Sequence, residues 1–413
     1  MSNTLYCGVD VAYRINRARC FDAQGVEAGN RLSTPNDGPG SLRLLEHLAT
    51  LARDGAYHEV RVALEATSFL GWHVAMMLSR PPVPAPVPLT VYLFNAKVIR
   101  KFKDTYTDVR KNDWFDARVL ADRLRFGHPL PLPFDPDDRY LPLQRLTRHR
   151  FRLVKQMVRD KNYFLSYLLL KCNTLSQGGP LSSPFTNTMA EILTSFHSAD
   201  EIAHAPLDQL AGFIAEKSNN RIMDPVSAAR AIQKAARHAY RLPEKLRDPV
   251  NRILASTLRN IRHLKQEIKS VTRNIEHEMG GLGTPLLSVP GIGPVFAAGL
   301  LSEIGHVQRF TDEASLAKFA GLTWRRRQSG DFHGDDSHLS RTGNCYLRYY
   351  LIEAANQVRT HTPEYAAYYH RKYHESKTHH HKRALVLTAR KLARLVFALL
   401  RENQLYTKPE KRS

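Results

Sequence analysis

The sequence predicts an α/β domain followed by a longer helical region, and three observations lead to this division. Short β-type runs alternate with helical spacings over residues 1–140. Five prolines among the fourteen residues 129–142 are typical of a linker. Beyond them, apolar residues recur at helical and heptad intervals. At 413 residues the chain is long enough for two or three domains, and its 43% hydrophobic content excludes wholesale disorder.

The first 140 residues carry the elements of a mixed sheet. Residues 6–12 are short and apolar, and residues 17–21 are predicted to form a second strand. The sequence at residues 22–25 predicts a hairpin turn that leads into a third strand. The elements that follow are a helix at 41–51, a strand at 60–65, a helix at 72–78, a strand at 89–94 and a helix at 113–126. This alternation predicts an α/β fold.

Residues 141–280 are expected to form a helical coiled-coil linker region. Within it, residues 246–279 repeat apolar side chains every seven positions. The row is Leu254, Ile261, Ile268 and Ile275, with Val250, Leu264 and Val271 at the companion position and Thr257 and Glu278 as interruptions. Such a repeat predicts a coiled coil, within one chain or between two chains. A helix packed in a bundle explains the same pattern equally well.

Residues 281–413 are predicted to form a compact helical domain with a polar insert at 325–345. Its first motif, Pro290-Gly291-Ile292-Gly293, is typical of the turn in a helix-hairpin-helix. Gly291 and Gly293 would let backbone amides approach a phosphate at a helix N-terminus. These two glycines are therefore candidate nucleic-acid contacts. A glycine-rich connection between helices, without any ligand, is the alternative.

The charge of the chain is unevenly distributed. Sixty Lys and Arg against 39 Asp and Glu give a net charge of +21. Residues 1–140 hold 18 basic and 16 acidic residues, whereas residues 141–413 hold 42 and 23. A surplus of this size favours a polyanionic partner, and nucleic acid is the expected one. A solvated basic surface without a partner is the alternative. Membrane lipid is less favoured, because the basic helices lack a Trp- or Leu-rich insertion face.

Several classes of protein are excluded by the residues themselves. The four cysteines lie far apart, which excludes a zinc ribbon and a disulfide scaffold and fits a reducing compartment. We expect neither a signal peptide nor a membrane span, because no basic stretch precedes an early apolar run and no uncharged apolar segment reaches about 18 residues. The run His379-His380-His381 is not expected to bind a metal, because three adjacent side chains on a helix point in different directions.

Four carboxylates in residues 1–140 are placed as a metal site would need. Asp10 lies within a hydrophobic strand and Glu65 ends another, where an unpaired charge is costly. Asp113 and Asp116 are three residues apart and share one face of a helix. Carboxylate oxygens are the ligands that Mg²⁺ prefers, and two such ions can clamp a phosphoryl transfer. The alternative is ordinary ion pairing of these acids with Arg110, Lys111 and Arg118.

A polar segment in the C-terminal region holds a candidate nucleophile, Ser329. Basic residues flank this serine in the sequence, and they are candidate nucleic-acid contacts: Arg325, Arg326, Arg327, Arg341 and Arg348. Cations stabilise both a serine alkoxide and the phosphate that it attacks. Spacing alone does not assign the nucleophile, because Ser-Gly pairs are common in polar loops.

Taken together, these motifs resemble the insertion-sequence-110 family of DEDD transposases, which are bridge-RNA-guided recombinases. The resemblance covers nearly the whole chain. Asp10 in Gly-Val-Asp-Val-Ala and Glu65 in Ala-Leu-Glu-Ala-Thr match the first two acids, and Lys111–Ala117 matches the motif that supplies Asp113 and Asp116. Pro-Gly-Ile-Gly, Ala-Gly-Leu, Ser-Gly and Arg-x-Gly-Asn-x-x-Leu-Arg then follow in the family's order. Trp324 departs from the pattern, since the family commonly has proline after Gly-Leu-x.

The resemblance implies an RNase-H-like (RuvC-like) catalytic domain over residues 1–140, a coiled-coil linker over 141–280 and a transposase domain over 281–413. It implies that the four acids hold Mg²⁺ and that Ser329 forms a covalent phosphoserine link to DNA, with Ser340 as the reserve nucleophile. The implied partners are donor DNA, target DNA and a structured guide RNA. A homodimer or homotetramer would let the terminal domains share one site. The implied location is the cytoplasm of a bacterial or archaeal cell, at the nucleoid.

Two other classes of function stay open. In a Holliday-junction-type nuclease the acids would cleave with water, and Ser329 would be structural. In a non-catalytic nucleic-acid-binding protein the acids would only form ion pairs. The first differs in leaving a free DNA phosphate, and the second in lacking Mg²⁺-dependent strand scission.

Overall fold

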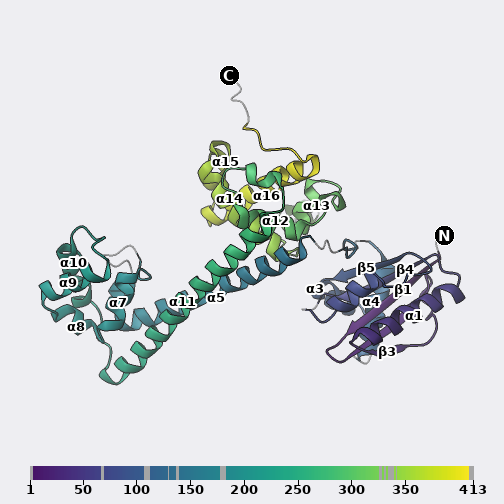
Figure 1. Cartoon of the computed structure of the whole chain (residues 1–413), viewed down its shortest axis with the longest axis horizontal. Helices are drawn as coiled ribbons and strands as arrows, with labels where there is room; N and C mark the ends of the chain where they lie inside the picture. The colour runs from purple at the N-terminus through teal and green to yellow at the C-terminus, as the bar shows by residue number, and fades with distance from the viewer. Residues whose placement is uncertain are drawn as a thin grey trace. The chain divides into compact units, whose positions relative to one another are not determined.

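The computed structural model divides the chain into two compact units, residues 1–138 and 139–413 (Figure 1). The described residues are 3–66, 69–106, 112–128, 130–135, 139–176, 183–324, 328–329, 332–333, 339–340 and 342–408; for 328–329 and 332–333 the description is limited to strand pairing. The first unit is α/β and the second is mostly helical, which confirms the predicted fold classes. The division expected at residue 280 remains a prediction.

The first unit is built on a five-stranded mixed sheet with the order β3-β2-β1-β4-β5. The strands are β1 (Thr4–Val11), β2 (Ile15–Phe21), β3 (Leu32–Pro35), β4 (Glu59–Glu65) and β5 (Leu89–Phe94). The first three strands pair antiparallel, whereas β1, β4 and β5 are parallel. Parallel neighbours need crossover connections, and the predicted helices supply them. The carboxyl ends of β1 and β4 therefore lie side by side at one edge of the sheet.

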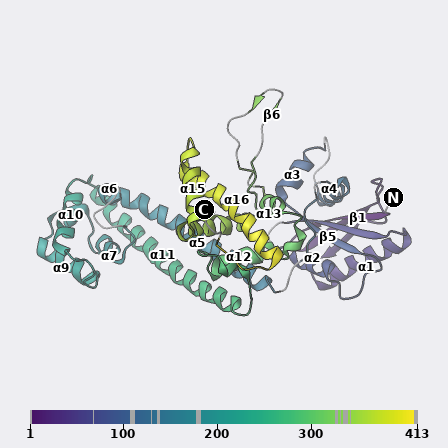
Figure 2. The same ribbon diagram turned by 90° about the horizontal axis from the view of Figure 1, so that it is seen from above.

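Helices cover both faces of this sheet, as Figure 2 shows. The elements are α1 (Gly38–Asp54), α2 (Trp72–Ser79), α3 (Ala96–Lys103) and α4 (Asp113–Phe126). Apolar side chains of α1 and α2 pack on one face, and those of α3 and α4 pack on the other. The sequence pattern missed α3, which is short and rich in lysine and arginine. Its start is signalled by Asn95, whose side chain accepts a hydrogen bond from the Lys97 amide.

Helix α4 approaches β1 closely at Gly8. A Cβ atom at residue 8 would lie 1.9 Å from the carbonyl oxygen of Ala117 and 2.6 Å from the amide nitrogen of Ala121. Both are backbone atoms of α4, so no side chain can swing away to make room. The missing side chain at Gly8 thus sets the distance between the strand that carries Asp10 and the helix that carries Asp116.

We expect Gly8→Ala to lower the stability of the first unit by about 1–3 kcal/mol, because α4 must move off the sheet. Gly38→Ala is a matched control, since a Cβ at residue 38 would have no atom within 4 Å. Thermal unfolding followed by calorimetry measures both changes. Unfolding of Gly8→Ala at the wild-type temperature would show that the close approach of α4 to β1 does not matter.

The second unit is organised around two long helices, α5 (Leu141–Lys171) and α11 (Glu244–Met279), that lie side by side (Figure 1). They run antiparallel, because Arg150 Nε donates to Thr272 Oγ1 at 3.0 Å and Lys171 Nζ donates to Asn251 at 2.6 Å. The heptad row of α11 is mostly buried, with Ile268 half-buried. The partner of the heptad helix is thus a helix of the same chain.

One end of the α5–α11 pair carries a cluster of short helices. These are α6 (Asn173–Ser176), α7 (Asn187–Ser195), α8 (Ala199–His204), α9 (Leu207–Lys217) and α10 (Pro225–Arg237). Lys171 fixes the junction: its ammonium group, nearly buried, donates to the carbonyl oxygens of Leu193 and Phe196. Burial lowers the pKa of Lys171 to about 8.

The other end of the pair carries the remaining elements of the second unit. These are η1 (Pro285–Ser288), α12 (Pro294–Ile304), η2 (Val307–Arg309), α13 (Glu313–Phe319), β6 (Gln328–Ser329), β7 (Phe332–His333), α14 (Cys345–His361), α15 (Pro363–Glu375) and α16 (His380–Glu402). Two details differ from the sequence prediction. The helix before the Pro-Gly-Ile-Gly turn is one 3₁₀ turn, and the polar insert contains a two-stranded sheet. Among the described residues, no helix is long and apolar enough to span a membrane.

Candidate functional site

The four predicted acids come from three neighbouring elements of the first unit. Asp10 lies near the end of β1, and Glu65 is the last residue of β4. Val9 and Leu64 are paired across β1 and β4, and Asp10 and Glu65 are the next residues of these strands. The two acids therefore lie at the same level on adjacent strands. Asp113 and Asp116 lie in the first turn of α4, the helix that packs against β1 at Gly8. The structure therefore brings Asp10, Glu65 and Asp116 to the carboxyl edge of the parallel strands, and Asp113 lies three residues before Asp116 on α4.

Three of the acids, Asp10, Glu65 and Asp116, interact through their negative charges, and we call this interaction their shared field. The pKa of Asp10 is raised to about 6, first by burial and then by the negative charges of Asp116 and Glu65. The pKa of Glu65 is also raised, by burial and by the charge of Asp116. Mutual repulsion of this kind marks a place where positive charge is needed, and such groups cluster at functional sites.

Two basic side chains partly supply that charge. Lys103 of α3 pairs with Asp116, and Arg17 of β2 pairs with Asp113. Both cations lower the pKa of Asp10. They differ from the partners considered from the sequence: Arg118 pairs with Asp122, while Arg110 and Lys111 lie outside the described residues. Arg17 was identifiable in principle, since it stands opposite Asp10 in the β1–β2 hairpin. Lys103 belongs to the helix that the pattern missed.

The carboxylate oxygens of this site suit a hard divalent cation, but two of the four acids form ion pairs with basic side chains. All four side chains are carboxylates, the donors that Mg²⁺ prefers. Across the described part of the chain, no three His, Cys, Asp or Glu side chains converge in a way that would hold a metal ion. Asp113 and Asp116 face Arg17 and Lys103 instead. A metal ion would therefore compete with these two basic side chains for the acids.

Asp10→Asn is expected to stabilise the first unit at pH 8 by about 1 kcal/mol, less than the full pKa shift implies because the side chain is only partly buried. The folded protein binds the Asp10 proton more tightly than the unfolded chain, whose pKa is near 3.8. The stability due to Asp10 thus falls as the pH rises from about 4 to 6, and the loss persists above 6. Thermal unfolding from pH 4 to 8 measures it. If the difference in stability between wild type and Asp10→Asn does not change with pH, the pKa of Asp10 is not raised and the shared field is contradicted.

The predicted nucleophile, Ser329, lies between two short stretches of chain that pair with each other. We call these paired residues, 323–324 and 339–340, the neck. Trp324 and Leu339 form a β-bridge, and the Ser340 amide donates to the Thr323 carbonyl oxygen at 2.8 Å. The hydroxyl groups of Thr323 and Ser340 lie 2.9 Å apart. Ser340 is thus part of the neck, whereas Ser329 pairs with Phe332 in the β6–β7 hairpin. The structure places the two candidate serines at different levels of the same segment.

Buried polar contacts at Asn344, four residues after Ser340, join the helices that follow and precede the neck in the sequence. The Glu303 side chain of α12 has no exposed surface and accepts two hydrogen bonds from Arg148 of α5, at 2.7 and 2.9 Å. It also accepts one from Asn344 at 2.7 Å. The Asn344 side chain in turn caps α14, and the backbone amide of Asn344 donates to the Phe319 carbonyl oxygen. The Gly-Asn motif therefore joins α5, α12, α13 and α14.

The predicted nucleic-acid contacts have different outcomes. Gly291 has φ of +97°, and a Cβ there would lie 2.8 Å from the α14 backbone, so packing alone requires glycine. A Cβ at Gly293 would have open space around it. Arg348 Nη1 donates to the Ala320 carbonyl oxygen at 2.9 Å, a structural contact. Arg325, Arg326, Arg327 and Arg341 lie outside the described residues. Nucleic-acid contact by these residues stays a prediction.

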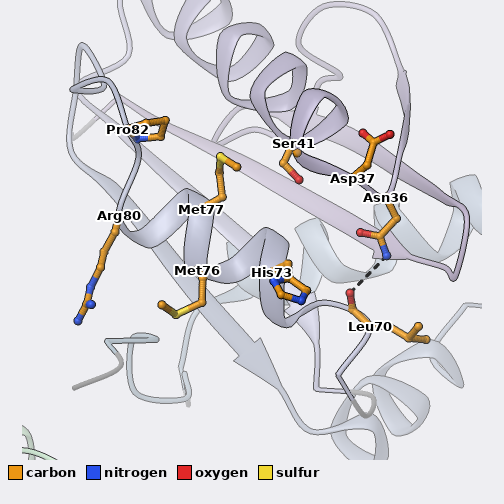
Figure 3. A pocket seen from close by; sticks show the side chains of 10 residues that line it. Asn36, Asp37, Ser41, Leu70, His73, Met76, Met77, Arg80 and Pro82 are labelled. Carbon is orange, nitrogen blue, oxygen red and sulfur yellow. Dashed lines mark hydrogen bonds between the residues drawn. The ribbon is translucent and has the colours of Figure 1, made fainter. Parts of the chain in front are cut away.

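A groove of about 630 Å³ lies between α1 and α2, on the opposite face of the sheet from α4 (Figure 3). Met77, His73 and Ser41 are among its lining residues. Asn36 closes one side, where its side chain donates to the carbonyl oxygens of Ala12 at 3.0 Å and Leu70 at 3.4 Å. None of the predicted site residues lines this groove.

Two family models match the chain in separate regions. A model described as Transposase (DEDD_Tnp_IS110) matches residues 7–172, and one described as Transposase IS116/IS110/IS902 family matches residues 283–370. The first match contains all four acids, and the second contains Ser329 and the neck.

Curated relatives agree with these matches. The chain is 26% identical to the "Insertion element IS116 uncharacterized 44.8 kDa protein" of Streptomyces clavuligerus, over 75% of this chain and 76% of that protein. It is 27% identical to the "Insertion element IS110 uncharacterized 43.6 kDa protein" of Streptomyces coelicolor, over 81% and 83%. A "Pilin gene-inverting protein" of Moraxella bovis is 29% identical, over 36% of this chain and 48% of that protein.

Proposed function

Because the chain belongs to the IS110 family of transposases, a family of DNA-processing enzymes, we propose that its four acids and Ser329 act on the same DNA phosphate. The observation that carries this proposal is the shared field of Asp10, Glu65 and Asp116 at the carboxyl edge of the sheet. Ion pairs alone would lower the pKa values of these acids, but burial first and then the neighbouring acids raise those of Asp10 and Glu65. The first unit is proposed to be RNase-H-like, with its mixed sheet and acid placement as support.

Asp10, Glu65, Asp113 and Asp116 would hold Mg²⁺, which when bound supplies positive charge that stabilises the phosphate during transfer. Arg17 and Lys103 neutralise part of the acid cluster in its absence. Once a bound cation neutralises the acids, we expect Arg17 and Lys103 to turn toward the DNA backbone. They would then help to hold the phosphate that is cut.

The Ser329 oxygen would bond to phosphorus as the bond from phosphorus to one DNA oxygen breaks. The serine hydroxyl loses its proton, and the departing DNA oxygen takes one up. The resulting phosphoserine keeps the energy of the broken bond, so that a second DNA hydroxyl can displace the serine and rejoin the strands. This chemistry requires the two units to meet at one phosphate, within a subunit or between subunits of a dimer or tetramer.

The basic second unit would hold donor and target DNA through their phosphates, together with a structured RNA from the element that pairs with both. The function is tested with purified protein, that RNA and two DNA substrates, with and without Mg²⁺. The proposal predicts Mg²⁺-dependent strand exchange. Cleavage that leaves only free phosphate ends would favour a water-using, Holliday-junction-type nuclease, and binding without scission would favour a non-catalytic protein.

A further inference from the structure

The junction of α15 and α16, residues 370–383, is dense in basic and aromatic side chains that the proposed chemistry does not use. It contains five Lys and Arg and five His against one acid, Glu375. That acid already pairs with Arg371 and Lys372 on its own helix. The only acid within residues 370–383 is thus already paired, while Lys377 and Lys382 are exposed.

Rings from both helices pack together at this junction. The Tyr369 and Tyr373 rings lie 6.1 Å apart on α15, and the His380 ring of α16 lies 5.2 Å from Tyr373 at an angle of 35°. His380 Nδ1 lies 3.0 Å from the Tyr373 carbonyl oxygen, which holds the first turn of α16 against the last turn of α15. Tyr373 is 37% exposed and His380 is exposed, so solvent reaches this ring pair.

The inner side of this ring cluster is fixed by the fold. Tyr369 is 5% exposed, and its hydroxyl lies 2.7 Å from His381 Nδ1. The Arg359 guanidinium of α14 lies 4.3 Å from the centre of the Tyr369 ring. Three helices thus hold the rings in place before any ligand arrives. A surface prepared in this way loses little side-chain freedom on binding.

The chemistry of the junction selects one class of ligand. Flat rings beside cations are the features that bind unpaired bases and their phosphates. A duplex covers its base faces by stacking, so that it could use only the cations. The rings therefore favour single-stranded nucleic acid over duplex.

We propose that residues 370–383 bind unpaired nucleotides, with bases stacked on Tyr373 and His380 and phosphates held by the exposed Lys377 and Lys382. The inference deepens the proposed function, because it rests on this protein's action on nucleic acid. It requires neither the four acids nor Ser329. The unpaired nucleotides could belong to loops of the RNA or to a displaced DNA strand, and both present the same base faces and phosphates.

The test measures fluorescence anisotropy of the full-length chain with labelled U12, dT12 and a 12-base-pair duplex. Ser329→Ala protein without Mg²⁺ serves as the background, so that no strand transfer interferes. Tyr373→Ala combined with His380→Ala should weaken binding of at least one single strand about tenfold or more and change duplex binding less than about twofold. Loss with U12 alone identifies RNA as the source, and loss with dT12 alone or with both identifies a DNA strand as a ligand.

Matched variants separate stacking from charge and from folding. Tyr373→Phe keeps the ring and should bind like the background protein. Lys377→Ala with Lys382→Ala should weaken all three ligands and reduce the salt dependence. Tyr240→Ala removes another exposed tyrosine of the second unit and should change nothing. Equal loss with duplex and single strands in the double ring variant, or no loss at all at native thermal stability, overturns the proposal. Failure here with strand exchange intact would leave the proposed function standing.

Discussion

Alanine at Asp10, Glu65, Asp113 or Asp116 is expected to reduce strand exchange about 10³-fold or more, with the fold preserved. Each change removes an oxygen donor from the proposed metal site, in which Asp10, Glu65 and Asp116 already repel one another. The remaining acids would hold a divalent cation less tightly and in a different geometry, and a loss of several kcal/mol in transition-state stabilisation corresponds to this factor. Product formation at saturating Mg²⁺ measures the effect.

Asp122→Ala is a matched control for these changes. Asp122 also lies on α4 and is nearly buried, but it accepts a hydrogen bond from Tyr106 at 2.7 Å and pairs with Arg118 instead of facing the cluster. We expect this variant to lose stability and, at a temperature where it stays folded, to recombine DNA. If Asp10→Ala recombines DNA almost normally at native thermal stability, the four acids do not form a metal site.

Ser329→Ala is expected to abolish both strand exchange and the covalent protein–DNA adduct while nucleic-acid binding is retained. A hydroxyl group is a weak nucleophile until its alkoxide is stabilised, and arginine cannot act as its base. The four arginines near Ser329 in the sequence would stabilise charge on the phosphate instead. Denaturing gels of a suicide DNA substrate that traps the adduct measure the loss.

Ser340→Ala is the matched control for the nucleophile. Its hydroxyl group lies 2.9 Å from that of Thr323 in the neck, so we expect a stability loss of about 1 kcal/mol and an intact adduct. An adduct that persists in Ser329→Ala and disappears in Ser340→Ala would move the nucleophile to the neck.

Much of the first unit was predictable because its signals are local. The strands, α1 and α4 follow from apolar alternation and helical spacing, and Asp10 and Glu65 are conspicuous as charges in apolar strands. The cations that face them were not predictable in this way. Lys103 reaches Asp116 through tertiary packing of α3, a helix of only eight residues whose few apolar side chains do not repeat long enough to mark a helix in the sequence.

In the second unit, the sequence pattern could not separate structural from functional glycine and arginine. Gly291 fits a phosphate-binding turn equally well as a close contact with α14, and only the position of α14 shows that packing requires it. Likewise, Arg348 is one basic residue among many until its bond to the Ala320 carbonyl oxygen is seen. The ring cluster at the α15–α16 junction was missed because its rings meet across two helices.

If the four acids and Ser329 serve one reaction, the position of the DNA phosphate on the protein must depend on both. Wild type, wild type without Mg²⁺ and Asp116→Ala are each incubated with the RNA and a suicide substrate, digested, and mapped by mass spectrometry. We expect a phosphate on Ser329 in the wild type with Mg²⁺ and none in the other two samples. A phosphate on Ser340, an adduct indifferent to Mg²⁺ and Asp116, or cleavage without any adduct would contradict this expectation.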